Sequence, residues 1–214
     1  FLFTNSIICV PLLMPPALLK LVLPFGPVKK ICTGINIIIS VIWISNNSFL
    51  FTRVLGLKIE TDGEQKLSMD EWYMVISNHQ SWIDIIALQT VFNRKIPFLK
   101  FFIKKELIWV PIMGVAWWAL DFPFMKRYSP GFLAKNPHLK GKDIEITKKA
   151  CAKFKTLPVS IMNFVEGTRF SENKHYRQKS PHKNLLKPKA GGTGFVLTIM
   201  GELLNSILDI TIKY

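Results

Sequence analysis

The sequence contains little that would indicate a metal centre, a disulfide framework or a nucleotide-binding loop. Its 214 residues include three cysteines and four histidines. Cys9, Cys32 and Cys151 are far apart, so their spacing matches neither a zinc motif nor a disulfide pattern. The glycine-rich run 191–194 lacks the lysine–serine ending of a P-loop, and we expect a helix start there. We therefore expect reduced cysteines, a cytoplasm-facing protein and no metal ion.

Acidic residues are scarce, and the resulting charge is uneven. The chain has 28 Lys+Arg against 14 Asp+Glu, and residues 94–189 alone hold 21 of the former and 6 of the latter. Such a positive field attracts nucleic acid, anionic lipid or phosphorylated substrates. No nucleic-acid recognition motif is present, and the amino-terminal part is strongly apolar. We therefore favour lipid or a phosphorylated substrate, with a simply solvated lysine-rich surface as the alternative.

Charge is absent from residues 1–19 and again from residues 31–50. About 20 apolar residues are enough for a helix to cross a bilayer. Together with the basic pair Lys29-Lys30 between them, the two runs predict an apolar helical hairpin, residues 1–50, in or on a membrane. Pro11, Pro15 and Pro16 should kink or break its first helix. A cleaved signal peptide is the alternative, although no charged region precedes the apolar run.

Residues 51–214 alternate between strand-like and helical patterns, which predicts an α/β domain with a mostly parallel sheet flanked by helices. The chain begins at Phe1 and stops inside a strand-like run, so we interpret it as a fragment cut at both ends. We expect strands at 74–76, 159–165 and 207–212, a strand and hairpin within 53–73, helices at 82–92, 143–154 and after 192, and loops at 128–142 and 171–189.

The stretch VISNHQSWIDII, residues 75–86, places His79 and Asp84 where an apolar strand ends and a helix begins. Ser81 and Asp84 match a helix-capping signature, which alone would explain the aspartate. If His79 lies in the loop and Asp84 on the helix, however, the carboxylate can bind one ring nitrogen and leave the other as a base. One geometry could serve both the cap and a catalytic pair.

A second polar motif, NFVEGTRF at residues 163–170, also follows a predicted strand. Ligands bind at the carboxyl ends of parallel strands, so both motifs are expected at one crevice. Gly167 permits close approach of the backbone, and Arg169 can bind phosphate through its planar fork. Taken alone, this tetrapeptide, Glu166–Arg169, favours a turn that carries a surface ion pair between Glu166 and Arg169.

Together, NHQSWID and FVEGTRF make the sequence similar to the glycerophospholipid acyltransferase family, the PlsC-type 1-acyl-glycerol-3-phosphate (lysophosphatidic acid) acyltransferases. The likeness runs from about residue 59 to residue 214 and is greatest to bacterial YihG-like proteins, through WALDFPFMKRYS and LLKPKAGG. The H-x-x-x-x-D box of the family falls on His79 and Asp84. Its E-G-T-R box falls on Glu166, Gly167, Thr168 and Arg169.

The intervening blocks of the family resemble KKELIWVPIMG, residues 104–114, and FMKR, residues 124–127. One departure is visible, because Asp121 stands where the family has a glycine. The resemblance implies the glycerophospholipid acyltransferase fold behind a membrane segment. It also implies that Arg169 binds the phosphate of the acceptor, with Arg127 and Lys126 as further candidates. Lys105 could attract the phosphates of the donor, or it could simply extend its ammonium to a membrane surface, as lysines beside apolar residues often do.

The resemblance implies transfer of an acyl group from acyl-CoA or acyl carrier protein to a lysophospholipid hydroxyl, with no other cofactor. His79 would act as the base that takes the proton of the acceptor hydroxyl, with Asp84 orienting it. Glu166 would shape the site or bind a glycerol hydroxyl. Backbone N–H groups at the start of the helix 82–92 would stabilise the oxyanion. An acyl-enzyme on Ser81 is the competing route.

The same residues leave two other functions open. One is acyl transfer to a lysophospholipid with another head group, and the other is a non-catalytic, basic, lipid-binding membrane protein, against which the intact pair His79 and Asp84 argues. The implied location is the bacterial cytoplasmic membrane with the site facing the cytoplasm, and no nucleic-acid partner is expected.

Overall fold

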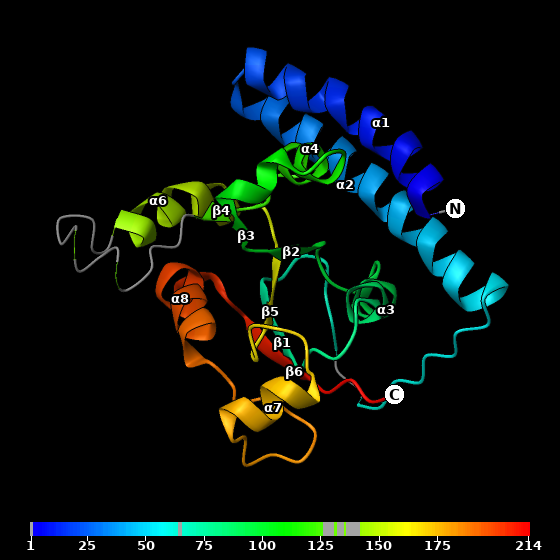
Figure 1. The fold of residues 1–214 in the computed structure, drawn as a ribbon. Helices are drawn as coiled ribbons and strands as arrows, with labels where there is room; N and C mark the ends of the chain where they lie inside the picture. Colours follow the sequence, from blue (N-terminus) through cyan, green and yellow to red (C-terminus); the bar gives the residue numbers. More distant parts are fainter. Residues whose placement is uncertain (1, 64–65, 126–130, 132–134, 136–141) are drawn as a thin grey trace.

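A computed structural model describes residues 2–63, 66–125, 131, 135 and 142–214. Its centre is a four-stranded parallel sheet with the strand order β2-β5-β1-β6 (Figure 1). The strands are β1 (Tyr73–Ser77), β2 (Leu99–Phe101), β5 (Ser160–Phe164) and β6 (Ser206–Ile210), and a separate parallel pair joins β3 (Ile103–Lys104) to β4 (Phe124–Met125).

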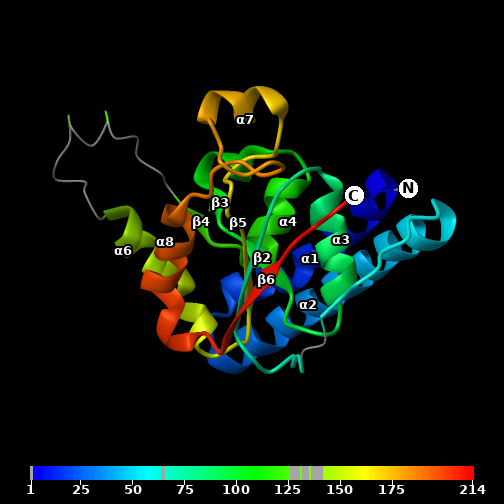
Figure 2. The ribbon, with the colours of Figure 1, turned by 90° about the horizontal axis from the view of Figure 1, so that it is seen from below.

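Helices cover both faces of the sheet (Figure 2). On one face, Tyr73 and Val75 of β1 pack with Leu88 and Phe92 of α3 (Ile83–Phe92). On the other face, Met74 packs against two helices, α6 (Lys142–Cys151) and α8 (Ala190–Met200). Because successive strand residues point to opposite faces, a strand buried on both sides reads as a continuous apolar run. The expected α/β architecture is confirmed.

Two long apolar helices precede the sheet. They are α1 (Leu2–Val22) and α2 (Gly26–Phe49), which run side by side and are joined by the short turn 23–25 (Figure 1). Leu13 and Ala17 of α1 pack in one buried cluster with Ala116 and Ala119 of α4 (Met113–Ala119). Both helices are long and apolar enough to cross a membrane by length and composition. Their outward-facing apolar side chains, such as Ile8 and Ile38, fit that setting.

Several local expectations were wrong. Helix α1 continues through its three prolines, because packing against α2 and α4 supports it where the prolines remove helical hydrogen bonds. The described part of 53–73 contains no strand ahead of β1, and α2 is extended by a π-helical turn, η1 (Leu50–Val54). Both neighbours of β1 are already β5 and β6, which leaves no edge there for a hairpin. The segment 171–189 contains a helix, α7 (Glu172–Gln178), while most of 128–142 lies outside the described residues.

Asp121 joins the hairpin to the α/β domain. Its backbone has a φ of 60°, a left-handed conformation that glycine adopts without strain. The sequence departure therefore keeps the backbone shape that glycine favours. Its carboxylate accepts a hydrogen bond from Lys20 Nζ of α1 at 2.6 Å, and Asn36 of α2 donates to the nearby Ala119 carbonyl at 2.9 Å. The backbone of Asp121 is strained, but its side chain forms an ion pair that glycine could not form.

We expect Asp121→Ala to lower the free energy of unfolding by about 1–3 kcal/mol, because the mostly buried ammonium of Lys20 loses its carboxylate partner, keeping only the Ala119 carbonyl, and the backbone strain remains. Asp121→Gly removes the same ion pair but relieves the strain, so it should be more stable than Asp121→Ala by about 1 kcal/mol. Denaturant unfolding of the two variants in one detergent measures the difference. Equal stabilities would show that the left-handed backbone carries no cost.

Candidate active site

The two polar motifs meet at the carboxyl edge of the sheet. Strands β1 and β5 are parallel neighbours, and their last residues, Ser77 and Phe164, are paired in register. The segments that follow the two strands also remain in contact, because the Val165 N–H donates to the Ser77 carbonyl at 3.0 Å and the Phe170 N–H donates to the His79 carbonyl at 2.7 Å. Sheet topology thus brings together motifs that lie more than eighty residues apart in the chain.

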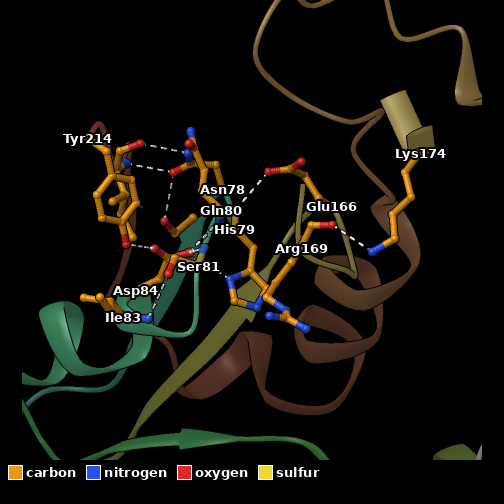
Figure 3. Close-up of polar contacts among 12 residues, drawn as sticks. Asn78, His79, Gln80, Ser81, Ile83, Asp84, Glu166, Arg169, Lys174 and Tyr214 are labelled. Carbon is orange, nitrogen blue, oxygen red and sulfur yellow. Dashed lines mark hydrogen bonds and ion pairs between the residues drawn. The ribbon is translucent and has the colours of Figure 1, made fainter. Parts of the chain in front are cut away.

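His79 and Asp84 form a hydrogen-bonded pair (Figure 3). The distance from His79 Nδ1 to Asp84 Oδ2 is 2.8 Å, and the Asp84 side chain is fully buried. Because an ionised carboxylate can only accept, Nδ1 carries the hydrogen and Nε2 presents its lone pair. The exposed fraction of the histidine side chain is 12%, so the ring is largely buried but not sealed from solvent. The pair has the geometry of an oriented general base.

The imidazole ring is also held by an aromatic neighbour that the sequence analysis did not single out. The ring of Phe164, at the end of β5, stacks on His79 with a centroid distance of 3.9 Å and an interplanar angle of 12°. Stacking restricts rotation of the imidazole ring about the Cβ–Cγ bond. The hydrogen bond to Asp84 fixes which ring nitrogen, Nδ1, points toward the carboxylate. The position of Nε2 is therefore defined by Phe164 of strand β5 and by Asp84 of helix α3.

Burial alone would raise the pKa of Asp84, yet its pKa lies below the ordinary value. The opposing effect comes from hydrogen bonds donated by the Tyr214 hydroxyl, the Ser81 N–H, His79 and the Gln80 N–H. Three of these donors bind Oδ2, with distances of 2.8 Å from His79, 2.6 Å from Gln80 and 2.9 Å from Ser81. Hydrogen bonds to the charged form keep a buried carboxylate ionised at neutral pH.

The helix-capping role and the pairing role of Asp84 coexist. Its carboxylate binds the Ser81 N–H, as in one half of a capping box, while the Ile83 N–H donates to Ser81 Oγ at 3.3 Å. The Asp84 N–H donates to the Ser81 carbonyl at 3.3 Å. The expectation that N–H groups at the start of the helix 82–92 stabilise an oxyanion is wrong for Ile83 and Asp84, because both N–H groups bond within the turn.

Glu166 is buried and links two segments of the main chain through its carboxyl oxygens. It is 1% exposed, and its two oxygens accept from the His79 N–H at 2.9 Å and from the Leu186 N–H at 2.8 Å. Of the two roles considered for this residue, these contacts support shaping the site rather than binding a glycerol hydroxyl. Gly167 beside it has a φ of 67°, and a Cβ there would meet the Lys189 side chain at 3.4 Å, so glycine suits the turn.

Arg169 lies exposed on the same side of the sheet edge as His79 (Figure 3). Its guanidinium carbon is 4.3 Å from the centre of the Trp82 ring, a cation–π contact. Lys174 of α7 holds the loop by donating to Thr168 Oγ1 at 2.8 Å and to the Arg169 carbonyl at 2.9 Å. The arginine is thus positioned through its backbone and through the face of its side chain.

The remaining predicted site residues are less directly placed. Lys105 is exposed at the start of a short 3₁₀ helix, η2 (Lys105–Trp109), outside the hydrogen-bond network around His79. Lys126 and Arg127 lie outside the described residues. Within the described ranges, no three His, Cys, Asp or Glu side chains gather in a way that could hold a metal ion.

A model of the acyltransferase family matches residues 58–198, which include both motifs and the strands that carry them. The chain belongs to the acyltransferase family. The matched range includes His79, Asp84, Glu166 and Arg169, whose contacts are described above.

Individual relatives agree with the family match. The chain is 28% identical over 115 residues to 1-acyl-sn-glycerol-3-phosphate acyltransferase alpha of Mus musculus and of Homo sapiens, a stretch that covers 53% of this chain and 35% and 36% of those proteins. It is 28% identical over 120 residues to an uncharacterized acyltransferase of Schizosaccharomyces pombe, covering 56% of this chain and 38% of that protein. The chain thus matches little more than a third of the length of these relatives. No solved structure matches it.

The lowered pKa of Asp84 makes a prediction about acid stability. A carboxylate whose pKa is lower in the folded state stabilises the fold above its unfolded pKa, about 3.9, and this contribution is lost as the pH falls through the folded value. At neutral pH, Asp84→Asn should lower the free energy of unfolding by about 1–3 kcal/mol, because an amide cannot accept hydrogen bonds from all four donors. Below pH 4 the difference between the two proteins should shrink. Unfolding measured from pH 7 to pH 3 tests this, and a constant difference would contradict it.

Proposed function

We propose that the protein transfers a fatty acyl group from an acyl thioester, acyl-CoA or acyl carrier protein, to the free hydroxyl of a lysophospholipid. The favoured acceptor is 1-acyl-glycerol-3-phosphate, and the product is then phosphatidic acid. The observation that carries the proposal is the oriented His79–Asp84 pair with an exposed arginine at the same edge of the sheet. The name of the mammalian relatives, 1-acyl-sn-glycerol-3-phosphate acyltransferase alpha, supports the choice of acceptor.

The chemistry begins with the acceptor hydroxyl, which is far too weak an acid to ionise at neutral pH. His79 Nε2 removes its proton while the oxygen attacks the thioester carbonyl, and the buried Asp84 stabilises the imidazolium that forms. The carbon–oxygen bond forms and the carbon–sulfur bond breaks. The thiolate leaves with the electron pair, since thiols have a pKa of about 8.5, and it can receive the proton from His79.

Arg169 binds the phosphate of the acceptor in this proposal. The cation–π contact with Trp82 uses the flat face of the guanidinium, so the N–H groups in its plane stay available for two phosphate oxygens. Because Trp82 lies between His79 and Asp84 in the chain, the same turn that carries the base also orients the arginine. This arrangement couples the position of the phosphate to the position of the base.

We further propose that the apolar hairpin holds the enzyme at a membrane, where lysophospholipids reside. Support comes from the length and composition of α1 and α2 and from their outward-facing apolar residues. The bacterial cytoplasmic membrane, with the site on the cytoplasmic side, and a place among the YihG-like acyltransferases are the finer proposals. They rest on the quoted segments WALDFPFMKRYS and LLKPKAGG.

His79→Ala should reduce acyl transfer by about 10²–10⁴-fold, because it removes the proposed base. The assay supplies 1-acyl-glycerol-3-phosphate and a labelled acyl donor to protein in detergent micelles. His175→Ala is the matched control, since His175 lies on α7 with its Nε2 2.6 Å from the carbonyl of His182. A His79→Ala variant that keeps more than a tenth of wild-type activity would remove His79 from this role.

Arg169→Lys keeps the charge but loses the planar fork. Each lost charge-assisted hydrogen bond is worth about 1.5–3 kcal/mol, so the KM for the acceptor should rise tenfold or more while the KM for the donor changes little. Arg177→Lys, at an exposed position of α7, is the control. If the defect falls on the acyl donor instead, Arg169 belongs to the other half of the site, and an unchanged KM for both substrates would exclude a binding role.

A further inference from the structure

The segment that follows β6 crosses the catalytic turn. Asn78, the residue before His79, uses both ends of its side-chain amide on one residue of this segment. Its Nδ2 donates to the Ile212 carbonyl at 2.9 Å, and its Oδ1 accepts from the Ile212 N–H at 2.7 Å. Asn78 is itself only 6% exposed. The amide therefore holds residue 212 against the catalytic turn much as a neighbouring strand would.

This anchoring places the Tyr214 hydroxyl on the catalytic carboxylate (Figure 3). The hydroxyl donates to Asp84 Oδ1, whereas the donors from the catalytic turn all bind Oδ2. Burial of the hydroxyl and the negative charge of Asp84 raise the pKa of Tyr214 to about 12. The tyrosine therefore keeps its proton throughout the physiological range and acts as a donor.

We propose that Tyr214 is a positioning residue for the catalytic pair: its hydroxyl fixes the free oxygen of Asp84 and so sets how firmly the carboxylate holds the proton that it shares with His79. The proposal rests on the proposed function only for its activity measurement. It concerns a residue 130 positions from Asp84, in the segment that follows β6, whereas the catalytic turn follows β1.

The expected direction follows from the charge on Asp84. Without the Tyr214 donor the carboxylate is more basic, so it holds the Nδ1 proton more tightly and favours the protonated pair. The other charged groups at the pair are Glu166, bonded to the His79 N–H, and Arg169, stacked on Trp82. Tyr214→Phe leaves both in place. The acid limb of the pH–rate profile should therefore move to higher pH in the variant.

Tyr73 provides a matched control within the same sheet. Its hydroxyl donates to Glu71 at 2.6 Å and accepts from the Ser68 N–H, but this tyrosine–carboxylate contact lies at the amino end of β1. Tyr73→Phe removes an equivalent hydrogen bond far from the base. Tyr214 is 65% exposed as a whole residue, so Tyr214→Phe should fold as the wild type does.

The first measurement is kcat/KM for acyl transfer from pH 5 to pH 9. Losing one charge-assisted hydrogen bond predicts about a tenfold fall for Tyr214→Phe at neutral pH, a shift of the acid limb upward by about one pH unit, and little change in KM for either substrate. Tyr73→Phe should keep the wild-type profile. Superimposable profiles for Tyr214→Phe and wild type would overturn the proposal.

A second measurement needs no substrate. Neutral imidazoles react with diethyl pyrocarbonate, so peptide mass spectrometry can follow the modification of His79 against pH, with His175 and His182 as internal references. The midpoint for His79 should rise in Tyr214→Phe and stay unchanged in Tyr73→Phe. A raised midpoint in a protein that transfers no acyl group would retain the role of Tyr214 and reject the proposed function. An unchanged midpoint would reject the role of Tyr214.

Discussion

The structure depends most on how a fully buried negative charge is stabilised. Asp84 has lost its hydration, and a carboxylate in that position is stable only where hydrogen bonds replace the water. Its donors come from the turn after β1 and from the segment after β6. Each donor therefore helps to stabilise the buried charge, and their convergence on Asp84 fixes the start of α3. The base is oriented as a consequence of the same requirement.

A second buried carboxylate serves the main chain of the site rather than its chemistry. Glu166 binds the N–H of His79 on one side and the N–H of Leu186 on the other. The backbone of the histidine is thus fixed by Glu166, while its ring is fixed by Asp84 and by stacking on Phe164. Strand β5 supplies Phe164 and leads directly into Glu166, so its pairing with β1 controls both contacts. Backbone and side chain of the base are held by independent groups, which is what a preorganised base requires.

Part of this could be predicted from the sequence, and the reasons for success and failure are physical. The apolar runs at β1, β5 and β6 indicate strands buried on both faces, and the spacing of His79 and Asp84 indicates a pair across a strand–helix join. By contrast, the role of Glu166 depends on an amide twenty residues later, and Tyr214 meets Asp84 only because β6 pairs with β1. The apolar alternation within 53–73 led to a wrong prediction of a strand and hairpin. A single sequence does not show that β1 already pairs with β5 on one side and β6 on the other. Helix α7 was missed because the strongly basic, aromatic-poor run 171–189 indicated a loop.

Burial separates the residues that hold the site in shape from the arginine that we propose binds the substrate. Asp84 and Glu166 are almost completely buried with their oxygens occupied, so neither can exchange its partners for a substrate at low cost. Arg169 is exposed, and stacking on Trp82 limits its rotamers without occupying its N–H groups. A hydrogen-bonded ion pair would have limited them equally, but it would also have competed with a phosphate for the same fork. The choice of an aromatic partner for the arginine is therefore the feature of this site that argues most directly for an anionic ligand.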